Sequence, residues 1–327
     1  MHPAPEHLLL PRSFSVRRSE LTCPASSPKM MTKAAASGAD EVILDLEDAV
    51  ALSQKESARA SLIDTLPHLE FGETLRAWRC NGIQTRWCHR DIVDVVEQVG
   101  QHLDVLVVPK VESAGDVHFI DRLLTQAELA ADLPVGKIRV EVLIESASGL
   151  LAAPGIAKAS PRLASLIFGI ADYAGDLGMK DFRDAPYATF AHARQSLIVA
   201  ARAAGICAID GVTVKFRDLE QVAADAEAGS HMGFDGKWAI HPSHLEPIHR
   251  AYTPSRSELE RAAALFEAYR RADVEGGVGA IAFGDEMVDA ASLRPEWRKL
   301  SIGRRVGLID EEGRLRDPKN ETAPENG

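Results

Sequence analysis

Residues 139–145 read RVEVLIE, and residues 163–172 read LASLIFGIAD. Each stretch is a short apolar run that leads to an acidic side chain, Glu145 in the first and Asp172 in the second. Apolar runs of this kind are typical of strands that are buried on both faces, as in a parallel sheet. The two stretches therefore predict neighbouring parallel strands with a carboxylate at or just beyond each C-terminal end.

Similar runs recur along the chain and predict eight strands, at residues 20–23, 41–46, 74–80, 105–109, 139–144, 163–169, 207–212 and 237–240. Helical patterns lie between them, among them residues 28–37, 54–66, 92–99, 116–131 and 191–204. Strands and helices that alternate eight times predict an α/β protein with a (β/α)₈ (TIM) barrel. A doubly wound sheet is the second possibility, but no GxGxxG follows an early strand.

The chain continues beyond what a barrel needs. Residues 255–273 predict a long amphipathic helix, and a glycine-rich stretch (276–279), residues 280–289 and a helix from about Ser292 follow. A glycine hinge before a segment that ends in a carboxylate, Asp289, is expected for a lid over an active site. We expect an N-terminal arm (1–17), the barrel (18–254), a C-terminal helical lid segment (255–309) and a disordered tail (310–327).

Composition narrows the class of protein. Hydrophobic residues make up 46% of the 327 residues, enough for a large core, and the formal net charge is -11. Nucleic acid and membranes are not expected partners, because no stripe of Lys and Arg and no membrane-spanning apolar run is found. The cysteines form no CxxC pair, which predicts a cytoplasmic protein without zinc or disulfides. They are Cys23, Cys80, Cys88 and Cys207.

Polar side chains recur where the predicted strands end. These are Glu47 and Asp48, Arg79 and Asn81, Lys110, Glu145, Asp172, Asp210 and His241. They are expected to converge at one mouth, because the C-terminal ends of barrel strands form the active site. Oxygen ligands suit a hard cation such as Mg²⁺, which can act as a Lewis acid on a carbonyl and stabilise an enolate. The pattern therefore favours a magnesium site over nucleophilic Ser-His-Asp or Cys-His chemistry.

Several motifs at these positions resemble one known family. The chain reads RSEL at 18–21 with Pro24, LDLEDAV at 44–50, RCNG at 79–82, VPKVE at 108–112, IES at 144–146, FGIAD at 168–172, GKWAIHP at 236–242 and MVD at 287–289. In this order they resemble the citrate lyase β-subunit and malyl-CoA lyase family. The resemblance implies a barrel assembled as a homo-oligomer, a trimer or a hexamer, in which the C-terminal segment covers a neighbouring subunit's site.

The resemblance also implies an activity. Members cleave or form 3-hydroxyacyl-CoA thioesters, such as malyl-CoA, citramalyl-CoA or citryl-CoA, with an acyl-CoA and a 2-oxo acid as the other reactants. Glu145 and Asp172 are then expected to bind Mg²⁺, with Mn²⁺ as an alternative, and Arg79 together with Glu145 to hold the 2-oxo acid. Asp289 is expected to act on an adjacent subunit, where it exchanges a proton with the methyl carbon of the acyl-CoA.

Three further residues receive roles from the resemblance. Glu47 and Asp48 are expected near the water shell of the metal, and Lys33 at the phosphates of CoA. Each also has a structural interpretation. For Glu47 and Asp48 it is support of the metal ligands from a second layer, and for Lys33 it is an exposed lysine on a helix. Arg79 also has a structural interpretation, an ion pair with Asp45 or Glu47. Lys110 and Asp210 are interpreted as residues that hold neighbouring carboxylates, and His241 as a hydrogen-bonding residue at a strand end.

Some positions depart from the family pattern. The usual Pro-Gly after the first strand is Pro24-Ala25, a common arginine is replaced within Ser26-Ser27-Pro28, and the loop after the sixth strand is shortened to residues 179–187. These departures leave three alternatives to the lyase open. They are a hydrolase in which water cleaves the thioester, a CoA-independent 2-oxo acid aldolase, and a non-catalytic subunit that requires partner chains.

Overall fold

The structure is a computed structural model that describes residues 16–276, 279–310 and 314–316. These residues form two compact units, which divide between Tyr252 and Thr253. Most of the predicted N-terminal arm lies outside the described residues, whereas Arg17 is buried within the first unit.

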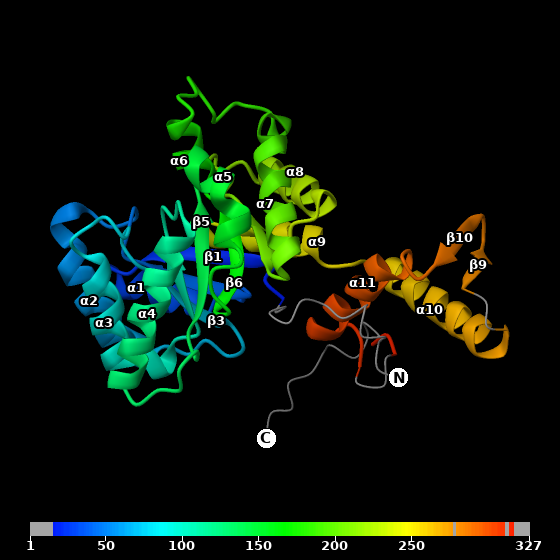
Figure 1. The fold of residues 1–327 in the computed structure, drawn as a ribbon, viewed down its shortest axis with the longest axis horizontal. Helices are drawn as coiled ribbons and strands as arrows, with labels where there is room; N and C mark the ends of the chain where they lie inside the picture. Colours follow the sequence, from blue (N-terminus) through cyan, green and yellow to red (C-terminus); the bar gives the residue numbers. More distant parts are fainter. Residues whose placement is uncertain (1–15, 277–278, 311–313, 317–327) are drawn as a thin grey trace. The chain divides into compact units, whose positions relative to one another are not determined.

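The first unit is a closed barrel of parallel strands arranged in sequence order, with β8 paired to β1 (Figure 1). The predicted (β/α)₈ fold is therefore confirmed, and the open doubly wound sheet is wrong because this sheet has no free edges. The strands are β1 (Ser19–Pro24), β2 (Glu41–Asp45), β3 (Leu75–Arg79), β4 (Val105–Val108), β5 (Arg139–Ile144), β6 (Leu163–Phe168), β7 (Cys207–Asp210) and β8 (Gly236–Ala239).

Helices connect consecutive strands and surround the barrel. They are α1 (Pro28–Ala35), α2 (Lys55–Thr65), α3 (Cys88–Val99), α4 (Ala114–Ala130), α5 (Ala147–Ile156), α6 (Ile170–Asp176), α7 (Ala191–Ala204), α8 (Leu219–Met232) and α9 (Leu245–Tyr252). Short 3₁₀ turns accompany them: η2 (Leu52–Gln54), η3 (Leu66–His68), η4 (Gly100–His102), η5 (Tyr187–Phe190) and η6 (Pro242–His244). Within the described ranges, no helix combines the length and the apolar character that crossing a bilayer requires.

Local signals set the helix ends. Ser113 and Asp116 form a reciprocal capping box at the start of α4, which satisfies backbone N–H groups that the helix itself leaves free. Gly205 and Gly233 end α7 and α8 in the left-handed conformation, with φ of 71° and 111°. Glycine adopts this conformation without steric cost, so both helices stop where the next strand must begin.

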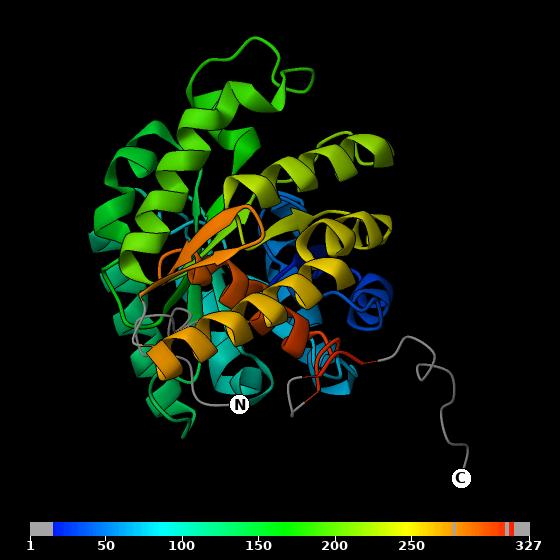
Figure 2. The ribbon, with the colours of Figure 1, turned by 90° about the vertical axis from the view of Figure 1, so that its right-hand side faces the viewer.

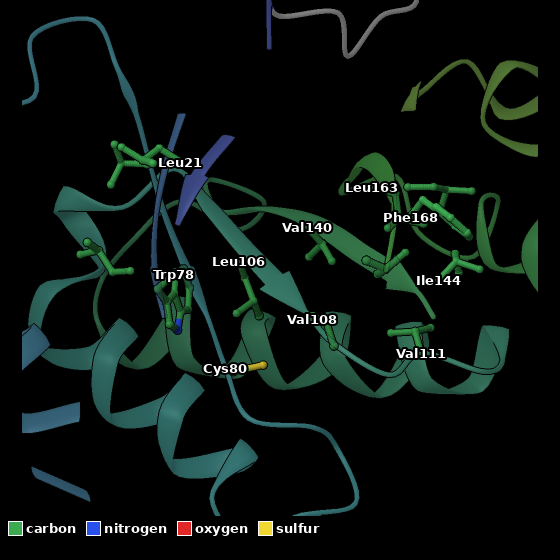
Figure 3. Close-up of a cluster of buried hydrophobic side chains, with 14 of the residues drawn as sticks. Leu21, Trp78, Cys80, Leu106, Val108, Val111, Val140, Ile144, Leu163 and Phe168 are labelled. Carbon is green, nitrogen blue, oxygen red and sulfur yellow. The ribbon is translucent and has the colours of Figure 1, made fainter. Parts of the chain in front are cut away.

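The barrel strands bury apolar side chains on both faces, which explains their unbroken apolar runs. Outward-facing residues such as Trp78, Leu106 and Phe168 belong to one large cluster with the surrounding helices (Figure 3). Inward-facing residues such as Ile43 and Leu143 form a separate apolar cluster inside the barrel. Because side chains alternate along a strand, the residues two positions before and after this layer also point inward.

The second unit contains α10 (Arg256–Gly276), β9 (Ala280–Phe283), β10 (Glu286–Asp289) and α11 (Leu293–Arg305), which can be followed by colour in Figure 2. Its core includes Leu265, Val288 and Leu293. The stretch 280–289 is an antiparallel hairpin, and Gly284 takes φ 60° in its two-residue turn. Of the glycine-rich stretch before it, residues 277–278 lie outside the described part of the chain.

The predicted tail is described only in part. Leu315 pairs with Ile309 in an antiparallel bridge, while residues 311–313 and 317–327 lie outside the described residues.

Candidate active site

Charged side chains gather at the C-terminal ends of neighbouring strands. β2 ends at Asp45, with Glu47 in the loop that follows, and β3 ends at Arg79. Lys110 follows β4, and Glu145 is the first residue after β5. The strand order places these ends side by side, and we call this group, together with Asp48 and Asp172, the mouth cluster.

Arg79 is held mainly by Asp45. Its Nε donates to Asp45 Oδ1 at 2.7 Å and its Nη2 donates to Asp45 Oδ2 at 2.6 Å, a bidentate pair. Its Nη1 lies 2.9 Å from Glu47 Oε2, an ion pair without hydrogen-bond geometry. The guanidinium also lies over the Trp238 ring, 5.3 Å from its centroid. Burial opposes the charge on Arg79, but Asp45 and Glu47 outweigh it and raise the pKa, so Arg79 is a fixed cation.

Asp45 has little capacity left for a metal. Besides the two Arg79 bonds, its oxygens accept the backbone N–H groups of Glu47 at 2.8 Å and Ala49 at 2.9 Å. Burial alone would raise the pKa of Asp45, but Arg79 and these N–H groups hold it below its usual value. Asp45 therefore positions Arg79 and the loop after β2.

Lys110 connects two of the carboxylates. Its backbone N–H donates to Glu145 Oε1 at 2.6 Å, and its Nζ donates to Glu47 Oε1 at 2.5 Å. The Nζ also lies 3.6 Å from Asp48 Oδ1. Lys110 has φ 55°, a left-handed backbone that is uncommon for a residue other than glycine. The lysine thus does what the sequence interpretation expected, since it holds a neighbouring carboxylate in place.

Glu145 needs the glycine that faces it directly after the next strand, β6. A Cβ atom on Gly169 would lie 2.4 Å from the Cβ of Glu145 and 2.7 Å from its Oε2. Only a residue without a side chain leaves this room. Asp172 follows Gly169 in the first turn of α6 and is exposed, whereas Glu145 is buried.

The electrostatics of the mouth disfavour the charged form of Glu145. Burial raises the pKa of Glu145 to about 8, and the Asp172 and Glu47 carboxylates add to the rise. Lys110 and Arg79 oppose this shift without cancelling it. When it is ionised, Glu145 therefore bears a negative charge that the described cations do not balance, as expected of a carboxylate that binds a metal.

Other predicted site residues lie elsewhere. Lys33 is an exposed side chain in the last turn of α1. Asp289 belongs to the second unit, where its Oδ1 accepts the N–H and the hydroxyl of Ser292, each at 2.9 Å. Hydrogen bonds with Ser292 lower the pKa of Asp289.

The remaining strand-end residues have structural partners. Asn81 donates from its backbone and from its side chain to Asp91. Asp210 accepts from Arg194 Nε at 2.8 Å and from the Tyr187 hydroxyl at 3.0 Å. The side chain of His241 hydrogen-bonds to Ser243. Within the barrel, the structure therefore brings together Glu47, Asp48, Arg79, Lys110, Glu145 and Asp172, whereas Asn81, Asp210 and His241 have other partners.

Sequence reasoning missed two contributors, Gly169 and Lys55. Lys55 is buried, and its Nζ donates to the carbonyl oxygens of Leu46 and Glu47 at 3.0 and 2.6 Å. The glycine had a signal in the sequence, since it stands two positions after the inward-facing Ile167. Lys55 had no such signal in the sequence, because its hydrogen-bond partners are backbone carbonyl oxygens of a loop.

The sequence of the chain is similar to a family profile and to several named proteins. Residues 18–242 match the sequence profile of the family described as HpcH/HpaI aldolase/citrate lyase. An L-malyl-CoA/beta-methylmalyl-CoA lyase of Cereibacter sphaeroides is 36% identical over 297 residues, which cover 85% of this chain and 91% of that protein. A (3S)-malyl-CoA thioesterase of the same organism is 38% identical over 259 residues, covering 79% and 85%.

A solved structure agrees with this assignment. The crystal structure of CitE from Mycobacterium tuberculosis, in complex with magnesium, acetoacetate and coenzyme A, is 32% identical in sequence, with a TM-score of 0.71. The match covers 90% of this chain and 99% of that chain. The chain belongs to the HpcH/HpaI aldolase/citrate lyase family.

Proposed function

We propose that this protein is a Mg²⁺-dependent carbon–carbon lyase that cleaves or forms a 3-hydroxyacyl-CoA thioester, with an acyl-CoA and a 2-oxo acid as products or substrates. One observation carries the proposal: a fixed cation, Arg79, lies at one barrel mouth with the carboxylates Glu145 and Asp172, and the described cations do not balance the charged form of Glu145. The malyl-CoA lyase relative and the CitE complex with magnesium and coenzyme A support it.

Glu145 and Asp172 have the chemistry of a magnesium site. Hard oxygen ligands suit Mg²⁺, which keeps several positions open for water and substrate oxygens. Burial raises the pKa of Glu145 most, and Asp172 and Glu47 add to the rise by repelling its charged form; a divalent cation would relieve this repulsion. When bound there, Mg²⁺ would polarise the carbonyl oxygen of the substrate.

Arg79 would bind the oxygens of the 2-oxo acid. Asp45 fixes the plane of the guanidinium, so little reorganisation is needed when substrate arrives. Glu47 faces Nη1 and is itself held by Lys110, which keeps it from moving toward the substrate. Asp48, which is exposed beside Lys110, would accept hydrogen bonds from water around the metal.

Asp289 would exchange a proton with the methyl carbon of the acyl-CoA. Cleavage leaves the thioester as an enolate that takes up a proton, and condensation removes that proton. Hydrogen bonds with Ser292 keep the pKa of Asp289 low in the isolated unit. A dry site would raise it toward the range that proton exchange needs. We therefore propose that the hairpin acts as a lid on a neighbouring subunit of a trimer or hexamer.

Lys33 would contact the phosphates of CoA, because α1 follows the C-terminal end of β1 at the rim of the mouth. Its exposure leaves the ammonium free to reach a flexible anionic ligand. A cytoplasmic location fits the four cysteines, which are all free and buried.

The thioesterase is the second candidate, because a (3S)-malyl-CoA thioesterase covers 79% of the chain at 38% identity. The two functions differ in their products. A lyase releases a 2-oxo acid and leaves the thioester intact, whereas a thioesterase releases free CoA, whose thiol can be titrated.

The test incubates purified protein and Mg²⁺ with malyl-CoA, citramalyl-CoA and citryl-CoA and measures 2-oxo acid and free thiol separately. Release of a 2-oxo acid without thiol, lost on addition of EDTA, is the expected result. Thiol release alone would favour the thioesterase. Absence of both products would contradict the proposal and favour an aldolase that acts on free hydroxy-oxo acids or a subunit that requires partner chains.

A further inference from the structure

A second acidic cluster lies inside the barrel at the opposite end from the mouth. Glu20, Glu41 and Glu141 each offer a carboxylate oxygen, and these oxygens all lie within 4.8 Å of one another. Glu41 is the first residue of β2, and Glu20 and Glu141 lie near the starts of β1 and β5. All three side chains are 0% exposed. We call them, together with Arg17, the floor cluster.

An apolar layer separates the floor from the mouth. On β2 the inward-facing residues are Glu41, Ile43 and Asp45, and on β5 they are Glu141, Leu143 and, directly after the strand, Glu145. Four residues of extended chain span about 13 Å. Ile43 and Leu143 belong to the interior apolar cluster between the two ends. The floor is therefore a distinct site and does not extend the mouth cluster.

Arg17 balances only part of the floor's charge. Its Nε donates to Glu41 Oε2 at 2.9 Å and lies 3.0 Å from Glu141 Oε1. With all three carboxylates ionised, these groups and the one guanidinium among the described residues sum to a formal charge of −2 in a place without solvent. Burial and the Glu141 and Glu41 carboxylates raise the pKa of Glu20 well above its usual value, which reflects the same imbalance.

The floor also has acceptor atoms without partners outside the cluster. Among the residues that the structure describes, Oε1 of Glu41 is buried and receives no hydrogen bond, and the carboxyls of Glu20 and Glu141 have only each other as hydrogen-bond partners. Buried polar atoms of this kind are rare in native proteins unless water or an ion satisfies them. An unpaired buried carboxylate costs more than a neutral group, because its whole charge is desolvated.

Ser165 adds an independent indication of a ligand. It is 0% exposed, and its Oγ has no hydrogen-bond partner among the described residues. Ser165 pairs in register with Glu141 on the adjacent strand, and Ile167 of the interior apolar layer stands two positions after it. The hydroxyl therefore points into the barrel from the position next to Glu141 on the adjacent strand, as a neutral oxygen ligand would.

We infer that the floor cluster binds one hard divalent cation, such as Mg²⁺, Ca²⁺ or Mn²⁺. Its charge would cancel the formal −2 of the cluster, which a monovalent ion would not do. Oxygen atoms up to 4.8 Å apart can share one ion, because Ca²⁺ takes its ligands at about 2.3–2.6 Å. The ion would have a structural role, tying β1, β2 and β5 together at the end of the barrel that lacks the active site.

The test counts metal in the full-length protein after treatment with a chelating resin. Wild type and Glu145→Gln are both expected to retain about one divalent ion per chain, measured by inductively coupled plasma mass spectrometry, because the floor is closed to solvent. The Glu20→Gln/Glu141→Gln double variant is expected to retain none. A matched control, Glu246→Gln/Glu260→Gln, removes two exposed carboxylates and is expected to behave as wild type.

Two results would overturn the inference. A folded wild-type chain free of divalent metal would mean that protons neutralise the floor, and equal retention by the double variant would place the ion elsewhere. Should the double variant fail to fold, Glu20→Gln alone replaces it, and the count in wild type and Glu145→Gln remains decisive. Because Glu145→Gln removes the mouth ligand, failure of the proposed function and failure of this inference give different results.

Discussion

The two ends of this barrel use the same strands and the same residue type in different ways. At the mouth, Arg79 and Lys110 accompany the carboxylates of Asp45 and Glu47, and Glu145 remains uncompensated beside the exposed Asp172. At the floor, Arg17 is the cation that the described part of the chain places against three carboxylates, and none of these carboxylates reaches solvent. The two clusters therefore differ in function because they differ in solvent access. An exchangeable ion and a substrate need an open site, which only the mouth offers.

The largest effect is expected from Glu145→Gln, which keeps the size of the side chain and removes its charge. Loss of a preorganised metal ligand should lower Mg²⁺-dependent cleavage by about 10³-fold or more. Turnover and Mg²⁺ affinity, measured on folded protein, check this expectation. The control is Glu246→Gln, an exposed carboxylate that should leave both unchanged. Full Mg²⁺-dependent activity in Glu145→Gln would show that the mouth holds its metal otherwise.

Arg79→Ala tests how much the cations of the mouth stabilise the fold. Asp45 would be left buried without its bidentate partner, which costs about 3–5 kcal/mol in the free energy of unfolding. Urea denaturation measures the loss. Arg250→Ala removes a guanidinium from an exposed ion pair and should change stability by less than about 1 kcal/mol. Equal losses of unfolding free energy in the two variants would mean that the buried Arg79–Asp45 pair stabilises the fold no more than an exposed ion pair does.

Gly169→Ala tests whether metal binding at the mouth is independent of metal binding at the floor, and it removes no charged group. The new Cβ would displace Glu145, so Mg²⁺ affinity at the mouth should fall by about 10–100-fold, while metal at the floor stays bound. Isothermal titration calorimetry measures the affinity. Gly155→Ala is the matched control, because its Cβ would meet no atom within 4 Å and alanine favours a helix. An unchanged Mg²⁺ affinity in Gly169→Ala would show that Glu145 is not a ligand of the metal at the mouth.

The smallest effect is the pH dependence of Mg²⁺ binding at the mouth. Burial raises the pKa of Glu145 to about 8, so below this pH the free protein holds a proton that the metal must displace. Affinity should therefore weaken by about tenfold per pH unit below 8 and level off above it. Calorimetry in buffers of different ionisation enthalpy reports the released proton. Binding without proton release at pH 7 would contradict this pKa.

Much of the fold and part of the site could be predicted from local patterns. Unbroken apolar runs such as 105–108 exist because barrel strands are buried on both faces, and strand order follows from short right-handed connections. Glu145 was recognisable by its place at a strand end. The hairpin at 280–289 was not recognised as a hairpin from the sequence.

The floor cluster shows what local patterns do not contain. Glu41 and Glu141 stand in apolar runs more than ninety residues apart, and neither has a sequence neighbour that indicates a partner. Only barrel closure brings β5 and β1 to a common interior, where three carboxylates and Arg17 meet.

The sequence by itself determined the alternation of strands and helices, the family and the carboxylates that end β5 and begin α6, because these depend on spacing along the chain. Tertiary structure decided which charges are neutralised. Asp45 and Glu145 are both acidic residues at strand ends, yet one is saturated by Arg79 and backbone N–H groups and the other is not. Solvation and partner distance set the state of a carboxylate, and both depend on strands that are distant in sequence.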